Sequence, residues 1–267
     1  TMRLPLIGLG TWDLRGEECA RVVRLALELG YRHIDTAYIY QNHQAIRSAL
    51  QGFSRDQVYL TSKLALEEQV DIGRIGGSIQ SACENALQEL GVDYLDLYLI
   101  HSPNRSFPLD RVFQSMNRLI EQGKVRKIGV SNYTARHLKD LEKTGLVPFA
   151  NQVEFHPYLY QKELLEVCRS NHIQLISYRP FGKGKLLKEE PLFDQMGSRY
   201  KKTGAQVILR WLIQKEICVV PKASSQQHLE ENLDIFDFTL TDEEMSTLDK
   251  LHRGKRFCRP DNPEFSY

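Results

Sequence analysis

The sequence of 267 residues has little of several features that would assign a protein to a class at once. Its 35 lysines and arginines balance 34 acidic residues, so the formal net charge of +1 offers no excess of cations to nucleic acid or an anionic membrane. No apolar run reaches the length of a membrane span, and no signal-like segment opens the chain. We therefore expect a cytoplasmic protein without nucleic-acid or membrane partners.

The cysteines also lack a pattern. Cys19, Cys83, Cys168, Cys218 and Cys258 include no CxxC pair and no Cys/His cluster with the spacing of metal ligands. An odd, scattered set is typical of free thiols in a reducing compartment, and buried inert thiols are commoner than catalytic ones. The sequence therefore predicts free cysteines and no metal site.

What the sequence does contain is a regular alternation of strand-like and helix-like segments. The strand-like runs are mostly apolar without alternation, which is typical of strands buried on both faces. They lie at 6–12, 32–37, 58–63, 94–102, 126–132, 151–156, 174–180 and 217–223. Amphipathic helix-like segments lie at 17–29, 77–91, 110–123, 134–145, 161–171, 205–215 and 241–251.

This alternation predicts an α/β fold. Eight strand and helix segments with short links favour one (β/α)8 TIM barrel, and a doubly wound open sheet is the alternative. No linker rich in Pro, Gly or Ser divides the chain. We therefore expect a single domain over residues 1–267.

Polar residues follow most of the predicted strands. In a (β/α)8 barrel the active site lies at the C-terminal ends of the strands, so these side chains should meet at one rim. Each residue alone has an ordinary structural interpretation, such as a turn cap or a packed aromatic ring. The expected convergence of all these polar side chains at one rim indicates a functional site there. Its members are Thr11, Trp12, Asp35, Tyr40, Lys63, His101, Ser131, Asn132, Gln152, Tyr178 and Lys222.

The stretch "RHIDTAYIYQN" (32–42) places a carboxylate and a phenol five residues apart. If Tyr40 is a proton donor, its free pKa of about 10 is too high for easy transfer at neutral pH. A neighbouring Lys63 ammonium would lower that pKa, by roughly three units before desolvation subtracts. Asp35 would keep the lysine protonated, and His101 would orient a carbonyl or share in the proton transfer. These four groups predict a site that polarises a carbonyl.

A polarised carbonyl needs a nucleophile. No Ser-His-Asp arrangement is evident in the sequence, so a bound hydride donor is the natural candidate. The one glycine-rich piece, "GKGKLL" (182–187), is not a Rossmann fingerprint. A nicotinamide cofactor would therefore be bound by a motif other than the Rossmann fingerprint.

At this point the sequence resembles the aldo-keto reductase family. The short loops and the tail segment "RPDNPEF" are similar to the bacterial branch that includes 2,5-diketo-gluconate and methylglyoxal reductases. The resemblance spans nearly the whole chain in the order of the family. It rests on "GLGTW" (8–12), "YRHIDTAYIYQN" (31–42), "LTSKL" (60–64), "YLDLYLIHSP" (94–103), "KIGVSNY" (127–133), "NQVEFHPYL" (151–159), "ISYRPFGKGKLL" (176–187) and "VVPKASSQQHLEENLDIFDFTL" (219–240).

The resemblance implies a barrel that reduces aldehydes and ketones with NADPH. It implies a catalytic tetrad of Asp35, Tyr40, Lys63 and His101, in which Tyr40 donates the proton, and a substrate pocket walled by Trp12, Tyr40 and His101. It also implies a set of residues that bind the cofactor. These are Thr11, Trp12, Asp35, Ser131, Asn132, Gln152, Tyr178, Arg179, Lys222, Ala223, Ser224, His228, Glu231 and Asn232.

Several positions depart from the family's usual residues. His228 stands where an arginine is usual and Ala223 where a serine is usual. Lys222 can still pair with a 2′-phosphate, but histidine is a weaker and pH-dependent substitute for arginine. We therefore expect NADPH to be preferred with a smaller margin over NADH, and the margin to shrink as pH rises.

Two further departures have less clear roles. His43 replaces a usual glutamate, and Arg179 replaces a serine and could reach the pyrophosphate. For each, an exposed residue at the rim is the ordinary interpretation.

Two other functions remain open. One is a regulatory or structural protein on the same scaffold that binds NADP(H) but is catalytically weak. The other is a (β/α)8 glycosidase using Asp35 and Glu154, which would leave Lys63 and Tyr40 without a role.

The short loops 65–73 and 102–110 and the tail 256–267 predict small carbonyl substrates such as dicarbonyls and keto-sugars. Phe257 and Cys258 would line the pocket. A monomer is expected, as is common in the family.

Overall fold

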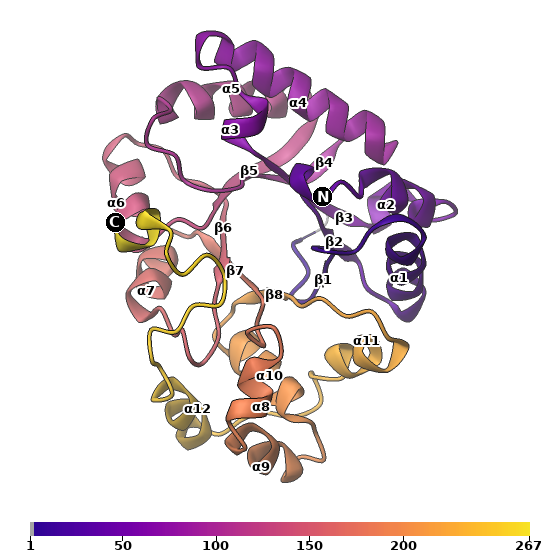
Figure 1. Ribbon diagram of the computed structural model, residues 1–267, viewed down its shortest axis with the longest axis vertical. Coiled ribbons are helices and arrows are strands. Elements are labelled where there is room, and N and C mark those ends of the chain that lie inside the picture. Colours follow the sequence, from indigo (N-terminus) through magenta and orange to yellow (C-terminus); the bar gives the residue numbers. More distant parts are fainter. Residues whose placement is uncertain (1–2) are drawn as a thin grey trace.

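The computed structural model describes residues 3–267 and contains one sheet of eight parallel strands in sequence order (Figure 1). The strands are β1 (Leu9–Gly10), β2 (His33–Asp35), β3 (Tyr59–Leu64), β4 (Leu95–Ile100), β5 (Val125–Ser131), β6 (Ala150–Glu154), β7 (Gln174–Tyr178) and β8 (Cys218–Val220). All eight predicted strands are therefore present, most of them shorter than predicted.

The sheet closes on itself through a narrow seam between β8 and the residues around β1. Ile7 and Val219 form a parallel bridge. The Gly8 amide donates to the Val219 carbonyl at 2.8 Å, and the Val219 amide donates to the Leu6 carbonyl at 2.8 Å. The closed sheet confirms the predicted (β/α)8 barrel and excludes the open doubly wound sheet.

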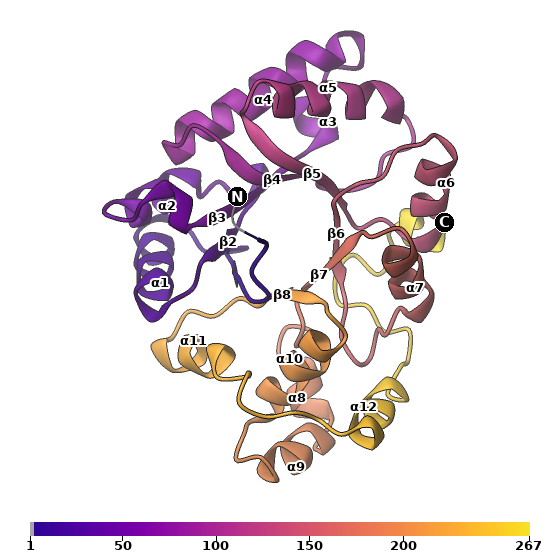
Figure 2. The ribbon, with the colours of Figure 1, turned by 180° about the vertical axis from the view of Figure 1, so that it is seen from behind.

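Helices surround the barrel, as Figures 1 and 2 show from opposite sides. They are α1 (Gly16–Leu29), α2 (His43–Leu50), α3 (Leu66–Gln69), α4 (Ile75–Leu90), α5 (Leu109–Glu121), α6 (Ala135–Lys143), α7 (Lys162–Ser170), α8 (Lys185–Glu189), α9 (Leu192–Ser198), α10 (Gly204–Gln214), α11 (Gln226–Leu233) and α12 (Asp242–Asp249). The sequence did not predict α2, α3, α8, α9 and α11. Each has at most eight residues, too few turns for a helical period to stand out.

The strand register sorts side chains into two sets. Those facing outward pack with the helices in the main core. Those facing inward include a smaller cluster inside the barrel, formed by Tyr59, Leu97, Leu99, Ala150, Ile176, Cys218 and Val220. Lys63 is in register with Leu99, and Gln152 with Ile176, so these two polar residues share the inward face with the apolar cluster.

The C-terminal tail crosses the face of the barrel that is turned to the viewer in Figure 1 and ends beside α6; it lies behind the strands in Figure 2.

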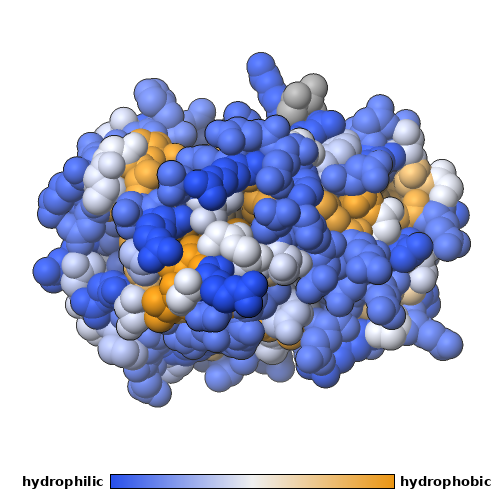
Figure 3. Space-filling view, turned by 90° about the horizontal axis from the view of Figure 1, so that it is seen from above, coloured by the Kyte–Doolittle hydropathy of each residue, from blue (hydrophilic) through white to orange (hydrophobic). Residues whose placement is uncertain are grey.

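The side of the molecule seen in Figure 3 is mostly hydrophilic, with apolar areas separated by polar side chains. All five cysteines are free, and four of them are buried.

Candidate active site

A cavity of about 700 Å³ opens at the C-terminal ends of the strands. Residues of the barrel form its floor, and the tail forms one wall. Of the site residues expected from the sequence, the cavity is lined by Trp12, Asp35, Tyr40, His101, Ser131, Asn132, Gln152, Tyr178, Arg179 and Lys222. The structure therefore brings most of the expected residues together, from seven of the eight strands or the loops that follow them; no residue of β3 lines the cavity.

A buried ion pair lies beneath this cavity. The Lys63 ammonium donates to Asp35 Oδ1 at 2.6 Å and to the Thr36 carbonyl at 2.9 Å. The second carboxylate oxygen of Asp35 accepts from Gln152 Nε2 at 2.6 Å. Both members of the pair are almost fully buried, with side chains 1% and 4% exposed. Both carboxylate oxygens are thus satisfied, and the lysine is fixed in place.

The charge state of Lys63 follows from this pairing. Burial by itself lowers the pKa of the ammonium, but the neighbouring Asp35 carboxylate and Tyr40 phenol outweigh it, and the pKa of Lys63 lies above its ordinary value. Lys63 is therefore a cation at neutral pH.

Tyr40 ends a short 3-10 turn, Tyr38–Tyr40, that follows β2. The Lys63 ammonium lies 5.1 Å from the centre of the Tyr40 ring. Burial raises the pKa of Tyr40 above its usual value, and the lowering effects of Lys63 and Arg179 do not cancel that rise. The sequence analysis correctly predicted that Lys63 lowers the pKa of Tyr40, but the net shift of that pKa is upward. Desolvation causes the rise, and the extent of burial cannot be derived from the sequence.

His101 follows β4, and its ring makes an edge-to-face contact with Tyr40 at 5.8 Å between centroids. Burial, with Lys63 and Arg259 adding to it, lowers the pKa of His101 to about 3. The imidazole is therefore neutral at physiological pH. It can donate one hydrogen bond but carries no positive charge.

Ser131 and Asn132 form the next part of the rim. Asn132 has a left-handed backbone (φ 63°), which asparagine tolerates better than most residues. Its Nδ2 donates to the His101 carbonyl at 2.9 Å, and its Oδ1 accepts from the Tyr178 hydroxyl at 2.6 Å. The Ser131 hydroxyl donates to the Gln152 carbonyl at 2.8 Å. These bonds hold the Tyr178 ring against the cavity.

Thr11 does not face the cavity. Its hydroxyl donates to the Asp35 carbonyl at 2.9 Å, and the residue is fully buried. Asn42 holds the same loop from the other side, because its Nδ2 donates to the carbonyls of Thr11 and Leu14, both at 3.0 Å. Thr11 thus positions the loop that carries Trp12, and Asn42 is a structural residue of the site that the sequence argument missed.

His43 is buried, 3% exposed, which contradicts its interpretation as an exposed rim residue. Its Nδ1 lies 2.9 Å from Glu89 Oε2, and its Nε2 lies 3.1 Å from Ser62 Oγ. The contacts resemble those of a hydrolytic triad, but Ser62 is completely buried on the outward face of β3 and lines neither cavity of the described chain. This array therefore ties α2 and α4 to the barrel.

A cluster of cations surrounds the half-exposed Trp12. Arg179 lies 4.4 Å from the indole, Lys183 5.7 Å and Lys222 6.0 Å. Lys222 also lies 3.6 Å from Asp13. Lys183 was missed by the sequence argument, although the "GKGK" segment that carries it stood out.

The remaining expected cofactor residues lie outside the cavity, in the loop before α11 and in that helix. Ser225 caps this helix by accepting from the His228 amide at 3.2 Å. Ser224 and His228 are exposed, whereas Ala223 and Asn232 are buried. Glu231 accepts from Gln227 Nε2 at 2.8 Å.

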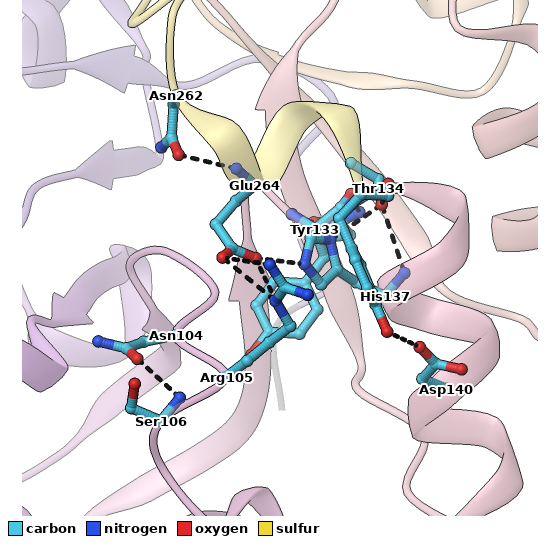
Figure 4. Close-up of polar contacts among 11 residues, drawn as sticks. Asn104, Arg105, Ser106, Tyr133, Thr134, His137, Asp140, Asn262 and Glu264 are labelled. Carbon is cyan, nitrogen blue, oxygen red and sulfur yellow. Dashed lines mark hydrogen bonds and ion pairs between the residues drawn. The ribbon is translucent and has the colours of Figure 1, made fainter.

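The C-terminal tail is held over the cavity at two places. Glu154, fully buried at the end of β6, accepts from the amides of Phe257 at 2.7 Å and Cys258 at 2.9 Å. Farther along, Glu264 contacts Arg105 at 3.1 Å and His137 at 2.9 Å, as Figure 4 shows. We call these contacts the Glu154 anchor and the Glu264 anchor.

The Glu154 anchor removes support from the glycosidase alternative, because both candidate carboxylates are already engaged. Asp35 is paired with Lys63, and Glu154 binds tail amides and His156.

Within residues 3–267, no group of three or more His, Cys, Asp or Glu side chains is arranged to hold a metal ion. None of the helices in that range is long and apolar enough to cross a membrane.

The comparisons with known proteins agree with the geometry. Residues 6–253 match the model of the aldo/keto reductase family. The chain is 38% identical to the 9,11-endoperoxide prostaglandin H2 reductase of Trypanosoma cruzi (strain CL Brener), over 98% of this chain and 93% of that protein. It is 39% identical to the glyoxal reductase of Bacillus subtilis (strain 168), over 96% of this chain and 91% of that protein.

Among solved structures, a putative 2,5-diketo-D-gluconic acid reductase B superimposes with a TM-score of 0.88 at 36% identity, over 94% of this chain and 90% of that one. The resemblance read from the sequence is thereby confirmed. With the family's model matched over most of its length, and with reductases of this kind covering it nearly end to end, the chain belongs to the aldo/keto reductase family.

Proposed function

We propose that this protein reduces small aldehydes and ketones to alcohols, with NADPH as the hydride donor and Tyr40 as the proton donor. The observation that carries the proposal is the buried Asp35–Lys63 pair, which places a fixed ammonium beside the Tyr40 ring at the floor of an open cavity. The reductase names of the relatives support the same reaction class.

The residues around the cavity fit a nicotinamide dinucleotide. The Tyr178 ring offers a stacking surface, and the amide oxygens of Asn132 and Gln152 can accept hydrogen bonds from a carboxamide. Arg179 and Lys183 have no ion-pair partner among residues 3–267, so they are available to phosphate groups. A bound reduced nicotinamide supplies the hydride that the carbonyl carbon accepts.

The chain's own residues supply the proton and the polarisation. The Tyr40 hydroxyl donates its proton to the carbonyl oxygen, and its raised pKa keeps it protonated until that moment. The fixed Lys63 cation stabilises the phenolate that remains, and Asp35 holds the lysine in position. The neutral His101 donates a hydrogen bond that orients the carbonyl oxygen.

The cofactor preference follows from the exposed residues beyond β8. Lys222 is the cation that we assign to the 2′-phosphate of NADPH, with the His228 imidazole and the Ser224 hydroxyl as further hydrogen-bond donors. The absence of an arginine at position 228 weakens this contact, so NADH remains a poorer but usable cofactor.

The test is NADPH consumption with a panel of small aldehydes and dicarbonyls, comparing the wild type with Tyr40→Phe. Removing a general acid typically costs roughly 10²–10⁴-fold in rate. Tyr38→Phe is the matched control, because Tyr38 is the exposed tyrosine of the same turn and does not line the cavity. Its activity should remain close to that of the wild type.

Other outcomes would redirect the proposal. NADPH binding without turnover by the wild type would favour the regulatory alternative. Absence of NADPH binding would refute the proposed cofactor.

A further inference from the structure

Arg259 is an exposed residue of the tail and borders two cavities at once. It lines the main cavity and a neighbouring one of about 330 Å³, together with His101 and Ser102. Among residues 3–267, no side chain or backbone group forms an ion pair or hydrogen bond with its guanidinium. It also lies close enough to His101 to lower the pKa of that imidazole. Arg259 is therefore an uncompensated cation beside the catalytic groups.

The charges around Arg259 favour an anion there. Asp35 is the one carboxylate that lines the main cavity in the described chain, and Lys63 already neutralises it. In the neighbouring cavity Glu264 is neutralised by its anchor, and Glu67 and Glu68 are exposed without reaching ion-pair distance of Arg259.

Arg259 is also separate from the cations that we assign to the cofactor. Arg179, Lys183 and Lys222 gather around Trp12, and none of them lines the neighbouring cavity. Arg259 borders that cavity with His101 and Ser102, on the side where the carbonyl oxygen meets its hydrogen-bond donor. A group bound to Arg259 would thus belong to the substrate.

The tail holds this arginine in place. The Glu154 anchor fixes the two residues before Arg259, and the Glu264 anchor begins five residues after it (Figure 4). Between the anchors, the Asn262 amide donates to the Arg259 carbonyl at 3.0 Å and closes a turn. Arg259 itself has a left-handed backbone, with φ 45°. A cation on a segment fixed at both ends loses little freedom when it binds a ligand.

We propose that Arg259 binds a carboxylate on the substrate, so that the enzyme favours aldehydes and ketones that carry an acid group over neutral ones. This inference rests on the proposed carbonyl reduction. An arginine fork matches a carboxylate with two parallel hydrogen bonds, which gives direction as well as charge. The carbonyl end of such a substrate is then presented to Tyr40 and His101.

The experiment compares succinic semialdehyde with butanal, which have the same chain length and differ in the terminal carboxylate. The quantity measured is the ratio of the two kcat/KM values with NADPH. We expect Arg259→Gln to lower this ratio roughly ten- to hundredfold, mainly through KM, as for loss of a hydrogen bond to a charged group. Arg259→Lys should lower it less. Arg253→Gln is the matched control, because Arg253 is a tail cation that pairs with Glu190 and lines neither cavity.

An equal ratio in the wild type and Arg259→Gln overturns the inference. So does a fall in NADP⁺ affinity in Arg259→Gln with the ratio unchanged, since the arginine would then serve the cofactor. Melting temperatures establish that each variant is folded, and Arg259→Lys alone decides the question if the glutamine variant is not.

A second readout separates this inference from the proposed function. If the wild type reduces neither aldehyde, carbonyl reduction fails, and calorimetric binding of succinate to the protein decides the role of Arg259. Binding that is lost in Arg259→Gln supports a carboxylate site. Binding that is equal in both, or absent from the wild type, overturns it.

Discussion

The first four strands and the last four contribute different kinds of charge to the same cavity. Asp35, Lys63 and His101 come from the first half of the barrel and are buried, paired or neutral. Arg179 and Lys222 follow β7 and β8 and lie on the rim, with Asp13 at 3.6 Å from Lys222 as a loose partner. The groups we assign to chemistry are thus fixed in advance, whereas those we assign to cofactor binding remain available to an incoming anion.

This difference has an energetic reason. A buried ion must be paired to remain charged, and removing one partner leaves the other uncompensated. An exposed cation is solvated by water and can exchange that water for a phosphate at small cost. Substitutions in the first half should therefore damage both stability and turnover, and substitutions at the rim should change affinity alone.

The largest effect is expected for Lys63→Met. It leaves Asp35 buried without its counter-charge, which costs about 3–5 kcal/mol of stability, and it removes the cation that we assign to stabilising the Tyr40 phenolate. We expect a lower melting temperature and almost no NADPH oxidation. The double variant Asp35→Asn/Lys63→Met should recover part of the stability but none of the activity. Equal stability of Lys63→Met and the wild type would contradict the assigned pairing.

The pH profile sharpens the same comparison. The pKa values of Lys63 and Tyr40 lie above their ordinary values and that of His101 is about 3, so none of these three groups changes charge near neutral pH. We expect kcat/KM of the wild type to be nearly flat there and to fall at alkaline pH, as the Tyr40 hydroxyl loses the proton that we propose it donates. A steep change around pH 6–7 would show that a histidine titrates during catalysis.

Glu154→Gln tests the Glu154 anchor and should have an intermediate effect. The glutamine has one acceptor oxygen in place of two, so one of the two tail amides loses a hydrogen bond to a charged group, at about 1.5–3 kcal/mol. We expect a modest fall in melting temperature and a higher KM, because the wall formed by Phe257 and Cys258 loosens. Glu163→Gln, at an exposed position of α7, is the control. An unchanged KM would mean that the wall does not contact substrate.

The smallest effect is expected for His228→Arg at the rim. Because an exposed charge pair contributes less than about 1 kcal/mol, the preference for NADPH over NADH should rise about two- to fivefold. His252→Arg adds the same charge at another exposed histidine and should change nothing. An unchanged preference for NADPH in His228→Arg would exclude position 228 from the phosphate site.

Much of the site could be predicted from the sequence, because barrel topology places the ends of all strands at one rim. That rule located Asp35, Lys63 and His101 without any distance. The sequence could not give the environment of each group. The net rise in the pKa of Tyr40 depends on burial, and the burial of His43 depends on partners 19 and 46 residues away.

The contacts of the C-terminal tail were even harder to predict from the sequence. Glu154 and the amide of Phe257 are 103 residues apart, and no local pattern predicts their contact. For that reason Glu154 appeared as a possible catalytic carboxylate, and Arg259 did not appear as a candidate at all. Short helices such as α2 and α11 were missed because eight residues give little periodicity.

The seam that closes the barrel links ligand binding to the stability of the fold. β1 has two residues, and few backbone hydrogen bonds join it to the strand that ends the ring. Trp12 follows one side of this seam and Lys222 the other, with the ammonium 6.0 Å from the indole ring. A ligand in contact with both residues bridges the first and last strands and can bind only when the ring is closed. Opening of the ring is then linked to ligand concentration, and the thermodynamic stability of the whole barrel rises with occupancy of its rim.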